Sequence, residues 1–336
     1  MPWKERYTIS DEKSLADDDI RWPQDARCCV GITVDLSVAA RPDGIRAADL
    51  KTPEAEFGAN QGIAALLAVL KRHDLKATFA VPAVLAHIHA DQIRALIAEG
   101  HEIAAHGFKH EDVSALERDD ERARIARVTE ILTEVTGRRP EGWFSLPRQG
   151  DPFAGGTISS NTMDLLIEAG YAYMGNGLAD DIPHYWVTDF ATRRAILTLP
   201  YYYHFDDQFF LMFPRKGTGL EHPDALFKNW KAEFDAQYKR GRHFHMTLHP
   251  HHIGWCNRLQ LLDDFLAYLR GVPALWNPTG AECARYWLET YPASTYLRLE
   301  PSIWRDYPRQ PQLSRFSGGA PSPDFSKGVG ASGPWI

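Results

Sequence analysis

Two histidines four residues apart, in His106-Gly107-Phe108-Lys109-His110, are the first candidates for chemistry in this chain. They follow the short apolar run Ile103-Ala104-Ala105, so we expect them where a strand passes into a loop or a first helical turn. Both imidazoles can then face one point, which suits a divalent metal that accepts neutral nitrogen ligands. In a chain with 14 histidines this spacing is a weak signal by itself. It gains weight if a carboxylate joins the pair.

Asp35 is the candidate for that carboxylate, because it ends the apolar run Gly31-Ile32-Thr33-Val34. A buried carboxylate is costly unless it is paired, caps a loop or binds a metal. Loop capping is the ordinary role of such an aspartate. Together with His106 and His110, the metal role becomes the better interpretation. A metal held by one Asp and two His keeps open positions for water and a substrate carbonyl, which hydrolysis requires.

A second group of histidines lies between His243 and His252. On a strand, His243, His245 and His249 would share one face. Composition alone also allows a surface patch of histidines. We predict that His249 is catalytic, because it ends the strand directly before Pro250 and an imidazolium there can protonate a leaving amine.

Another strand end supplies the residues predicted to bind substrate, which are Trp143, Pro147 and Arg148. Core packing is the alternative explanation for Trp143 and its neighbour Phe144, since both would bury large apolar areas. Arg148 has the charge to orient a carboxylate or a polar substrate group. The acidic pair Asp206-Asp207 is assigned to a turn, the default role of adjacent aspartates in a loop.

Strand-like apolar runs alternate with helical periodicity along most of the chain. The expected strands are Cys28 to Leu36, Ala77 to Val81, Glu102 to His106, Trp143 to Leu146, Tyr171 to Met174, Ala195 to Pro200, Phe244 to His249 and Ala274 to Asn277. Seven or eight such units without an obvious linker predict an α/β fold, a (β/α) barrel that is TIM-barrel-like. A doubly wound sheet is the alternative. The barrel is favoured because Asp35, His106, Pro147 and His249 fall at strand carboxyl ends, which meet at one rim of a barrel.

The composition is that of an ordinary globular protein, with 44% hydrophobic and 24% charged residues and a net charge of −7 over 336 residues. This mild acidity argues against nucleic acid and membranes as partners. With no apolar segment at its start, the chain is expected to be cytoplasmic and to act on a small molecule. The four cysteines are predicted to be free thiols. Residues 1–25 and 296–336, the latter rich in Pro, Gly and Ser, are predicted to be arms around a catalytic barrel at 26–295.

These segments resemble the polysaccharide deacetylase (NodB-homology, carbohydrate esterase family 4-like) superfamily over residues 28 to 290. The motifs similar to that family are Val30-Gly31-Ile32-Thr33-Val34-Asp35, Ala105 to Glu111, Pro147 with its neighbours, and Thr247-Leu248-His249-Pro250. The resemblance implies a deformed barrel with an Asp-His-His metal site, here Asp35, His106 and His110. It also implies that His249 acts as an acid.

Within the superfamily, the chain is similar to a branch that holds cofactor-independent allantoinases, cyclic imide hydrolases and an atypical peptidoglycan deacetylase. The similar segments are Gly177 to Trp186, Leu199-Pro200-Tyr201, and His249 to Gly254. The family's first motif usually carries a second carboxylate that acts as base, where this chain has Thr33. The metal-free allantoinases lose the second histidine, which His110 retains, so the resemblance implies a metal enzyme. The Arg-x-Pro-Tyr motif of sugar deacetylases is replaced by Leu146-Pro147-Arg148-Gln149, which argues against a chitin-like glycan groove.

We therefore predict a metal-dependent hydrolase of a non-peptide carbon–nitrogen bond in a small, cyclic amide, imide or ureide. The ion is expected to be Zn²⁺, with Co²⁺, Mn²⁺ or Ni²⁺ as alternatives; it would polarise the carbonyl and lower the pKa of bound water. Glu111 is a candidate base if it turns inward. Two other functions stay open: an N-deacetylase of an acetylated sugar or glycan, and an inactive barrel with a binding role, which the missing base at Thr33 suggests. The resemblance also implies a homo-oligomer, with a tetramer as the expected form.

Overall fold

The computed structural model describes residues 12–13, 15–38, 41–148, 158–189, 192–202, 205–208, 223–296 and 298–299. Most of the predicted arm at 296–336 lies outside these residues. The described part of the predicted arm at 1–25 packs on the barrel, where the indole nitrogen of Trp22 donates to the carbonyl of Gly241 at 2.9 Å. Strand β1 (Glu12–Lys13), near the start of the chain, pairs antiparallel with β11 (Arg298–Leu299), near its end.

The main sheet contains a strand at each of the eight predicted positions. These strands are β2 (Cys28–Asp35), β3 (Thr78–Val81), β4 (Glu102–Ala105), β5 (Gly142–Trp143), β6 (Tyr173–Gly177), β8 (Arg194–Pro200), β9 (His243–Leu248) and β10 (Leu275–Trp276). A ninth strand, β7 (His184–Asp189), was not predicted and pairs antiparallel with β8. All other pairs within this sheet are parallel. The prediction of an α/β fold around a parallel sheet is therefore confirmed.

Strand β2 lies next to β9 near one end of the strand order and has two strands on its other side. Cys29 pairs with His243 of β9 and with Trp276 of β10, while Thr33 pairs with Thr247 of β9 and with Thr78 of β3. Because a residue has only two sides for pairing, β10 and β3 share the side of β2 opposite β9. The two ends of β2 therefore have different neighbours.

The remaining strands curve away from β2 in the order β3, β4, β5, β6, β8, β7. Among the described residues, no strand ladder joins β7 to β9, so hydrogen bonds do not close the sheet into a full circle. An isolated parallel bridge between Asp206 and Thr247 connects the chain beyond β8 to β9. This arrangement agrees with a deformed barrel.

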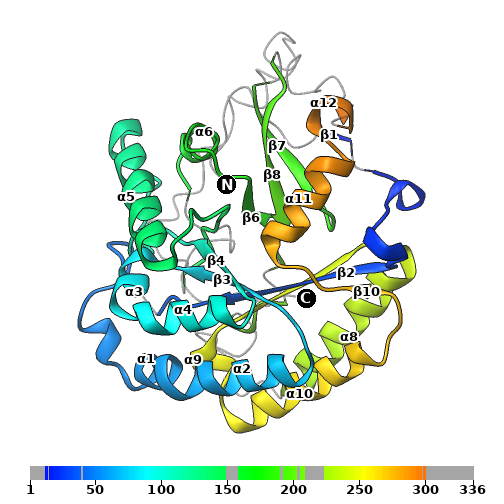
Figure 1. Cartoon of the computed structure of the whole chain (residues 1–336), viewed down its shortest axis with the longest axis horizontal. Coiled ribbons are helices and arrows are strands. Elements are labelled where there is room, and N and C mark those ends of the chain that lie inside the picture. Colours follow the sequence, from blue (N-terminus) through cyan, green and yellow to red (C-terminus); the bar gives the residue numbers. More distant parts are fainter. Residues whose placement is uncertain are drawn as a thin grey trace, which may run out of the picture.

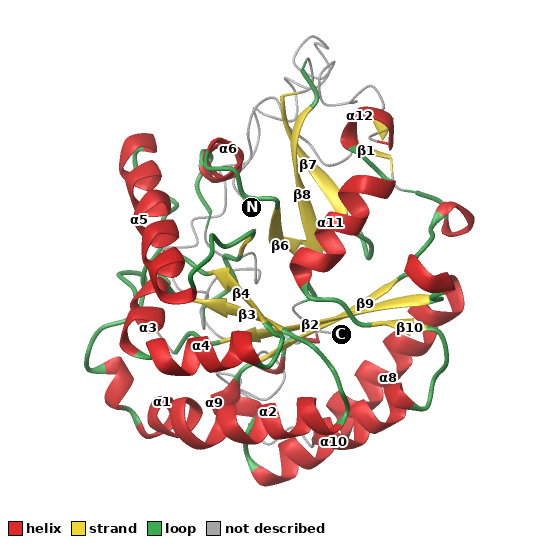
Figure 2. Ribbon diagram, viewed as in Figure 1, coloured by secondary structure: helices red, strands yellow, loops and turns green. Residues whose placement is uncertain are grey.

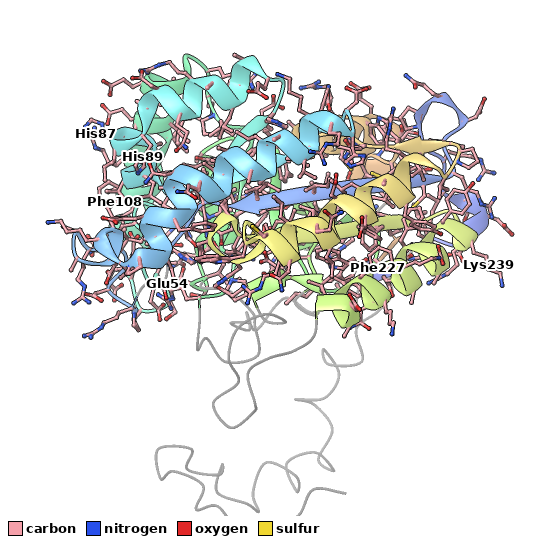
Figure 3. All side chains as sticks on the ribbon, turned by 90° about the horizontal axis from the view of Figure 1, so that it is seen from below. Glu54, His87, His89, Phe108, Phe227 and Lys239 are labelled. Carbon is pink, nitrogen blue, oxygen red and sulfur yellow. The ribbon has the colours of Figure 1, made fainter. Side chains whose placement is uncertain are left out.

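Helices cover the outside of the sheet, as Figures 1 and 2 show. They are α1 (Pro53–Phe57), α2 (Ile63–Arg72), α3 (Ala83–Ile88), α4 (Ala90–Ala98), α5 (Arg118–Thr136), α6 (Thr162–Glu168), α8 (Pro223–Arg240), α9 (Pro250–Ile253) and α10 (Cys256–Arg270). Two further helices, α11 (Gly280–Thr290) and α12 (Ala293–Tyr296), follow β10, and the backbone N–H of Ala281 at the start of α11 donates to Glu102 of β4 at 2.8 Å. Figure 3 shows α2, α10 and α8 side by side on the face seen from below, with Phe227 and Lys239 labelled on α8. With both faces of the strands covered, the strands read as apolar runs without clean alternation.

Candidate active site

Four predicted site residues meet at the carboxyl ends of three parallel strands. Asp35 is the last residue of β2, His106 follows β4, and His249 follows β9. His110 lies four residues beyond His106 in the same loop. The exposed fractions are 0% for Asp35, 1% for His106 and His249, and 6% for His110. The sheet therefore brings together residues that are far apart in the sequence and buries them in one place.

Asp35, His106 and His110 each present one polar atom without a hydrogen bond. These atoms are Asp35 Oδ2, His106 Nε2 and His110 Nδ1, all buried and unpartnered within the described part of the chain. The Oδ2 atom of Asp35 lies 3.5 Å from Nε2 of His106, and the two imidazole centroids are 4.2 Å apart. Buried polar atoms normally find a partner. One unpartnered oxygen and two unpartnered nitrogens at the same rim are the donor types that a divalent metal such as Zn²⁺ accepts, and the side chains need to move closer together to hold one ion.

The second ring nitrogen of each histidine and the second carboxylate oxygen of Asp35 already have hydrogen-bond partners in the protein. Nδ1 of His106 lies 3.1 Å from the carbonyl of Phe144, and Nε2 of His110 lies 3.0 Å from the carbonyl of Leu146. Since a carbonyl only accepts, those nitrogens carry the hydrogens and the other nitrogens keep their lone pairs. Oδ1 of Asp35 accepts from the backbone N–H of Ser37 at 2.6 Å. Such supporting contacts orient metal ligands.

The charge states at this point suit metal binding. Burial alone would raise the pKa of Asp35, but His106 and His249 outweigh it and hold this pKa well below its usual range, so the carboxyl is ionised. Burial and the neighbouring His106 lower the pKa of His110 to about 3, so its imidazole is neutral. His110 also has a positive φ of 57°. A left-handed backbone at a non-glycine residue is uncommon and is often found at functional sites.

His249 forms a hydrogen-bonded pair with Asp207, a residue that the sequence analysis assigned to a turn. Nδ1 of His249 lies 2.7 Å from Asp207 Oδ1, and the backbone N–H of His249 also donates to this carboxylate. Nε2 of His249 lies 3.3 Å from Asp35 Oδ2. Burial opposes a charge on His249, but Asp206 and Asp207 outweigh it and raise its pKa well above its ordinary value. The pair therefore keeps a proton on an imidazole that faces the three unpartnered donors.

Asp206, Asp207 and His249 have donor atoms that all lie within 4.8 Å of one another, close enough to hold an ion. Their donor atoms, however, are already used. Oδ2 of Asp206 accepts from the Tyr201 hydroxyl at 2.8 Å and Oδ1 from the backbone N–H of Gln208 at 2.8 Å. Burial and the adjacent Asp207 raise the pKa of Asp206 to about 7, although His249 opposes this. The atoms of the Asp206 set are therefore satisfied by the protein, whereas Asp35 Oδ2, His106 Nε2 and His110 Nδ1 are the ones that lack partners.

The position of the acidic pair contained a signal that the sequence analysis did not use. Asp206 and Asp207 follow β8, so they too lie beyond the carboxyl end of a parallel strand. The sequence analysis applied this criterion to Asp35, His106, Pro147 and His249, but treated the acidic pair as turn residues. Applied consistently, it would have placed the pair at the same rim.

The predicted substrate-binding residues lie beside the site. Nη2 of Arg148 is 3.6 Å from Asp112 Oδ2, and the side chain is 4% exposed. The carbonyl of Pro147 accepts from the side-chain amide of Gln208 at 3.2 Å. Trp143 donates to Ser145 Oγ and packs edge-to-face on Tyr171, with ring centroids 5.3 Å apart. These contacts locate the three residues, and their role in substrate binding stays a prediction.

Glu111 does not turn toward the three ligands as the candidate base would need to. One of its carboxylate oxygens accepts from the Arg124 side chain at 2.7 Å, and the other accepts from the backbone N–H of Lys109 at 2.7 Å. Thr33, at the position of the family's usual base, is buried on β2. The replacement for that base is therefore not Glu111 in this conformation.

A cavity of about 210 Å³ adjoins the site. It is lined by Leu36, Ser37 and Val38 after β2, by residues of α1 to α4, and by Pro250 and His251 after β9. Ser37 donates to Asp35, and the ring of His251 packs edge-on against His249 at 5.6 Å, so the cavity lies next to the reactive groups. It is smaller than the roughly 300–1,000 Å³ pockets that hold drug-sized ligands.

A tight contact positions the segment that carries His249 and His251. Gly62 lies so close to α9 that an added Cβ would meet the carbonyl oxygen of Pro250 at 2.3 Å. Gly58 is similarly close to His251, whose Cβ would lie 2.8 Å from an added Cβ. Glycines at these two positions let the π-helical segment Gly58–Gly62, between α1 and α2, pack directly on the segment after His249.

Comparison with known proteins shows which proteins this chain is similar to. The family model for polysaccharide deacetylase matches residues 54–174. A peptidoglycan deacetylase of Helicobacter pylori is 24% identical over 220 residues, which cover 58% of this chain and 72% of that protein. A peptidoglycan deacetylase-like protein of Gibberella zeae is 23% identical and covers 69% of this chain and 77% of that protein.

The crystal structure of the PuuE allantoinase is similar over most of its length. It superposes with a TM-score of 0.69 at 26% identity and covers 83% of this chain and 95% of that structure. The resemblance to the polysaccharide deacetylase superfamily, read from the motifs, is therefore confirmed. The match to the family model covers part of the chain, and the similar proteins include peptidoglycan deacetylases and an allantoinase. Over the residues that the structure describes, no helix is long and apolar enough to cross a membrane.

Proposed function

We propose that this protein is a metal-dependent hydrolase that opens a carbon–nitrogen bond in a small cyclic amide, imide or ureide. The observation that carries the proposal is the set of three unpartnered donors, on Asp35, His106 and His110, facing a protonated histidine that is held by Asp207. A bound Zn²⁺ would polarise the substrate carbonyl and make a water acidic near neutral pH. The family resemblance favours the same chemistry.

The protein's own residues supply the proton for the leaving nitrogen. Asp207 fixes Nδ1–H of His249, so the second proton of the imidazolium lies on Nε2. That atom is 3.3 Å from Asp35 Oδ2 and is unpartnered by any other described group. A nitrogen leaving a carbonyl next to Asp35 is therefore within reach of this proton.

The identity of residue 33 favours an activated substrate. Thr33 is a hydroxyl that cannot act as a base near neutral pH. A cyclic imide places two carbonyls on one nitrogen, which makes a better leaving group than an acetamide nitrogen. Such a substrate needs less help from a carboxylate base.

A parallel assay of two substrate panels tests the proposal. The zinc-loaded protein is expected to open succinimide, hydantoin or allantoin-like rings and to release little acetate from N-acetylglucosamine oligomers. Repeating both panels with Co²⁺ and Mn²⁺ removes the choice of metal as a variable. Acetate release without ring opening would favour the alternative function.

That alternative is N-deacetylation of an acetylated sugar or glycan. The Helicobacter pylori relative, named a peptidoglycan deacetylase, supports it. The two functions share the metal and the histidine acid and differ in the substrate that fits above them. If neither panel is turned over, the third function stands, an inactive barrel that binds a ligand.

A further inference from the structure

The barrel has a second group of metal-ligand types at its amino end. Cys29 of β2, His243 of β9 and Cys283 of α11 each offer a donor atom, and these atoms all lie within 4.8 Å of one another. Cys29 and His243 are direct partners in the register of the two strands. The exposed fractions are 0%, 1% and 2%. Cys29 and Asp35 are six positions apart on β2, about 20 Å at strand spacing.

One member of this group has a buried atom with no partner. Nδ1 of His243 makes no hydrogen bond to any residue that the structure describes. Leaving a buried imidazole nitrogen unsatisfied costs free energy, so a ligand or ion is expected there. Burial and the nearby His245 lower the pKa of His243 well below its ordinary value, so its imidazole is neutral and keeps a lone pair.

The backbone next to this group leaves room for two imidazoles. An added Cβ at Gly31 would meet Nδ1 of His245 at 2.6 Å and Nε2 of His243 at 3.1 Å. The rings of His243 and His245 are stacked, with centroids 5.8 Å apart. Trp22 packs against His243 at 6.3 Å and against Trp287 of α11 at 5.5 Å. Aromatic rings therefore pack around the group, as expected for a closed structural site.

We propose that Cys29, Cys283 and His243 bind a second metal ion, a structural Zn²⁺. Two thiolates and one neutral imidazole form a ligand set typical of zinc, and water or His245 supplies the fourth position. Zinc–sulfur bonds of about 2.3 Å and zinc–nitrogen bonds of about 2.0 Å place tetrahedral donors about 3.5–3.8 Å apart. Donor pairs now within 4.8 Å need to approach by at most about 1.3 Å.

Burial and the neighbouring Cys283 raise the pKa of Cys29, so the ion has to displace the two thiol protons against this effect, and binding releases them. The ion would connect three elements that are distant in sequence, β2, β9 and α11. This role is independent of the proposed hydrolase function. A metal ion would also explain why a neutral histidine lies beside two cysteines in the core. Two cysteines that only pack against each other do not need a histidine there.

Cobalt substitution tests this site separately from the one at Asp35, which contains no sulfur. The protein loaded with Co²⁺ is expected to bind two ions per chain and to show thiolate-to-cobalt charge-transfer absorption in the near ultraviolet. Cys283→Ser should lose this absorption and one ion, whereas His110→Ala should lose one ion and keep the absorption. His243→Gln serves as a second variant if Cys283→Ser does not fold.

Cys28→Ser is the matched control, because Cys28 is an equally buried neighbour on β2 that lies outside the group. It is expected to keep both the absorption and two ions. The proposal would be overturned if the cobalt-loaded wild-type protein lacked the thiolate-to-cobalt absorption. It would also be overturned if Cys28→Ser lost this absorption. A Cys29–Cys283 disulfide in freshly purified protein, detected by alkylation and mass spectrometry, would also overturn it.

Discussion

The two ends of the barrel interior use the same pair of strands for different donors. At the carboxyl ends of β2 and β9 lie Asp35 and His249, and at their amino ends lie Cys29 and His243. The first end combines a carboxylate with histidines, next to a cavity and a proton donor. The second combines thiols with a histidine and is packed under tryptophans. Parallel register therefore places two donor sets on one inner face, and their surroundings indicate a reactive site at one end and a structural one at the other.

Loss of a ligand at the carboxyl end should have the largest effect on activity. His110→Ala removes one of three protein ligands, and we expect it to abolish both turnover and one equivalent of bound metal. Metal analysis and the ring-opening assay check this. His87→Ala, at an exposed histidine on α3, is the matched control and should leave both unchanged. Full activity of metal-stripped His110→Ala would contradict a metal mechanism.

Removal of the proposed proton donor should lower the rate and leave the metal in place. We expect His249→Ala to reduce kcat by about 10²–10⁴. Steady-state kinetics and metal content measured on one preparation decide the point. A change in KM alone would instead make His249 a substrate-positioning residue.

The contact between Asp207 and His249 should set the basic limb of the pH profile. Asp206 and Asp207 raise the pKa of His249 against the effect of burial. A reaction that needs the imidazolium is active below this pKa and loses rate as the pH rises through it. In Asp207→Asn one of the two negative charges is gone, so the basic limb should move to lower pH. An unshifted profile would show that another group controls that limb.

The stability of the fold at the amino end should depend on a buried cation, Arg242, which pairs with Asp17 of the N-terminal segment. Arg242, with a side chain 6% exposed, pairs with Asp17 at 2.6 Å, with Asp180 at 2.9 Å, and with Asp181. We expect Arg242→Met to cost about 2–3 kcal/mol, less than the 3–5 kcal/mol of a fully buried pair because the carboxylates keep some solvent. Activity at the carboxyl end should persist in the fraction that remains folded.

Acid should reduce the difference in unfolding free energy between Arg242→Met and the wild type. Arg240 and Arg242 lower the pKa of Asp17, and the pKa of Asp181 is lowered although burial opposes it. The stabilisation from such carboxylates is complete above the unfolded pKa of about 3.9 and is lost as the pH falls through the folded value. Urea unfolding at pH 7 and near pH 3 measures the difference in unfolding free energy between the two proteins at each pH. An equal difference at both pH values would contradict the assignment of this stabilisation to the carboxylates paired with Arg242.

Much of the carboxyl end could be predicted from the sequence, because strand ends and histidine spacing are local signals. Asp35, His106, His110 and His249 were named from such signals, and the structure brings them together. The contact between His249 and Asp207 depends on how the chain beyond β8 approaches β9, which no local pattern specifies. Strand β7 was missed for a similar reason, since its pairing with β8 is antiparallel and lies outside the repeating βα pattern.

The amino-end group was harder to predict from the sequence. Cys29 and Cys283 are separated by most of the chain and have no metal-binding spacing, so the sequence predicted four free thiols. Only the pairing of Cys29 with His243 and the placement of α11 bring the donors within one ion's reach. Register, a property of the folded sheet, is the missing information.

Anomalous diffraction at the zinc edge from crystals of the zinc-loaded protein tests the central claim most directly. The account predicts a peak between Asp35 Oδ2, His106 Nε2 and His110 Nδ1, the atoms left unpartnered among the described residues. The peak should disappear in His110→Ala. A peak at Asp206, Asp207 and His249 instead, or no peak at the carboxyl end, would contradict it.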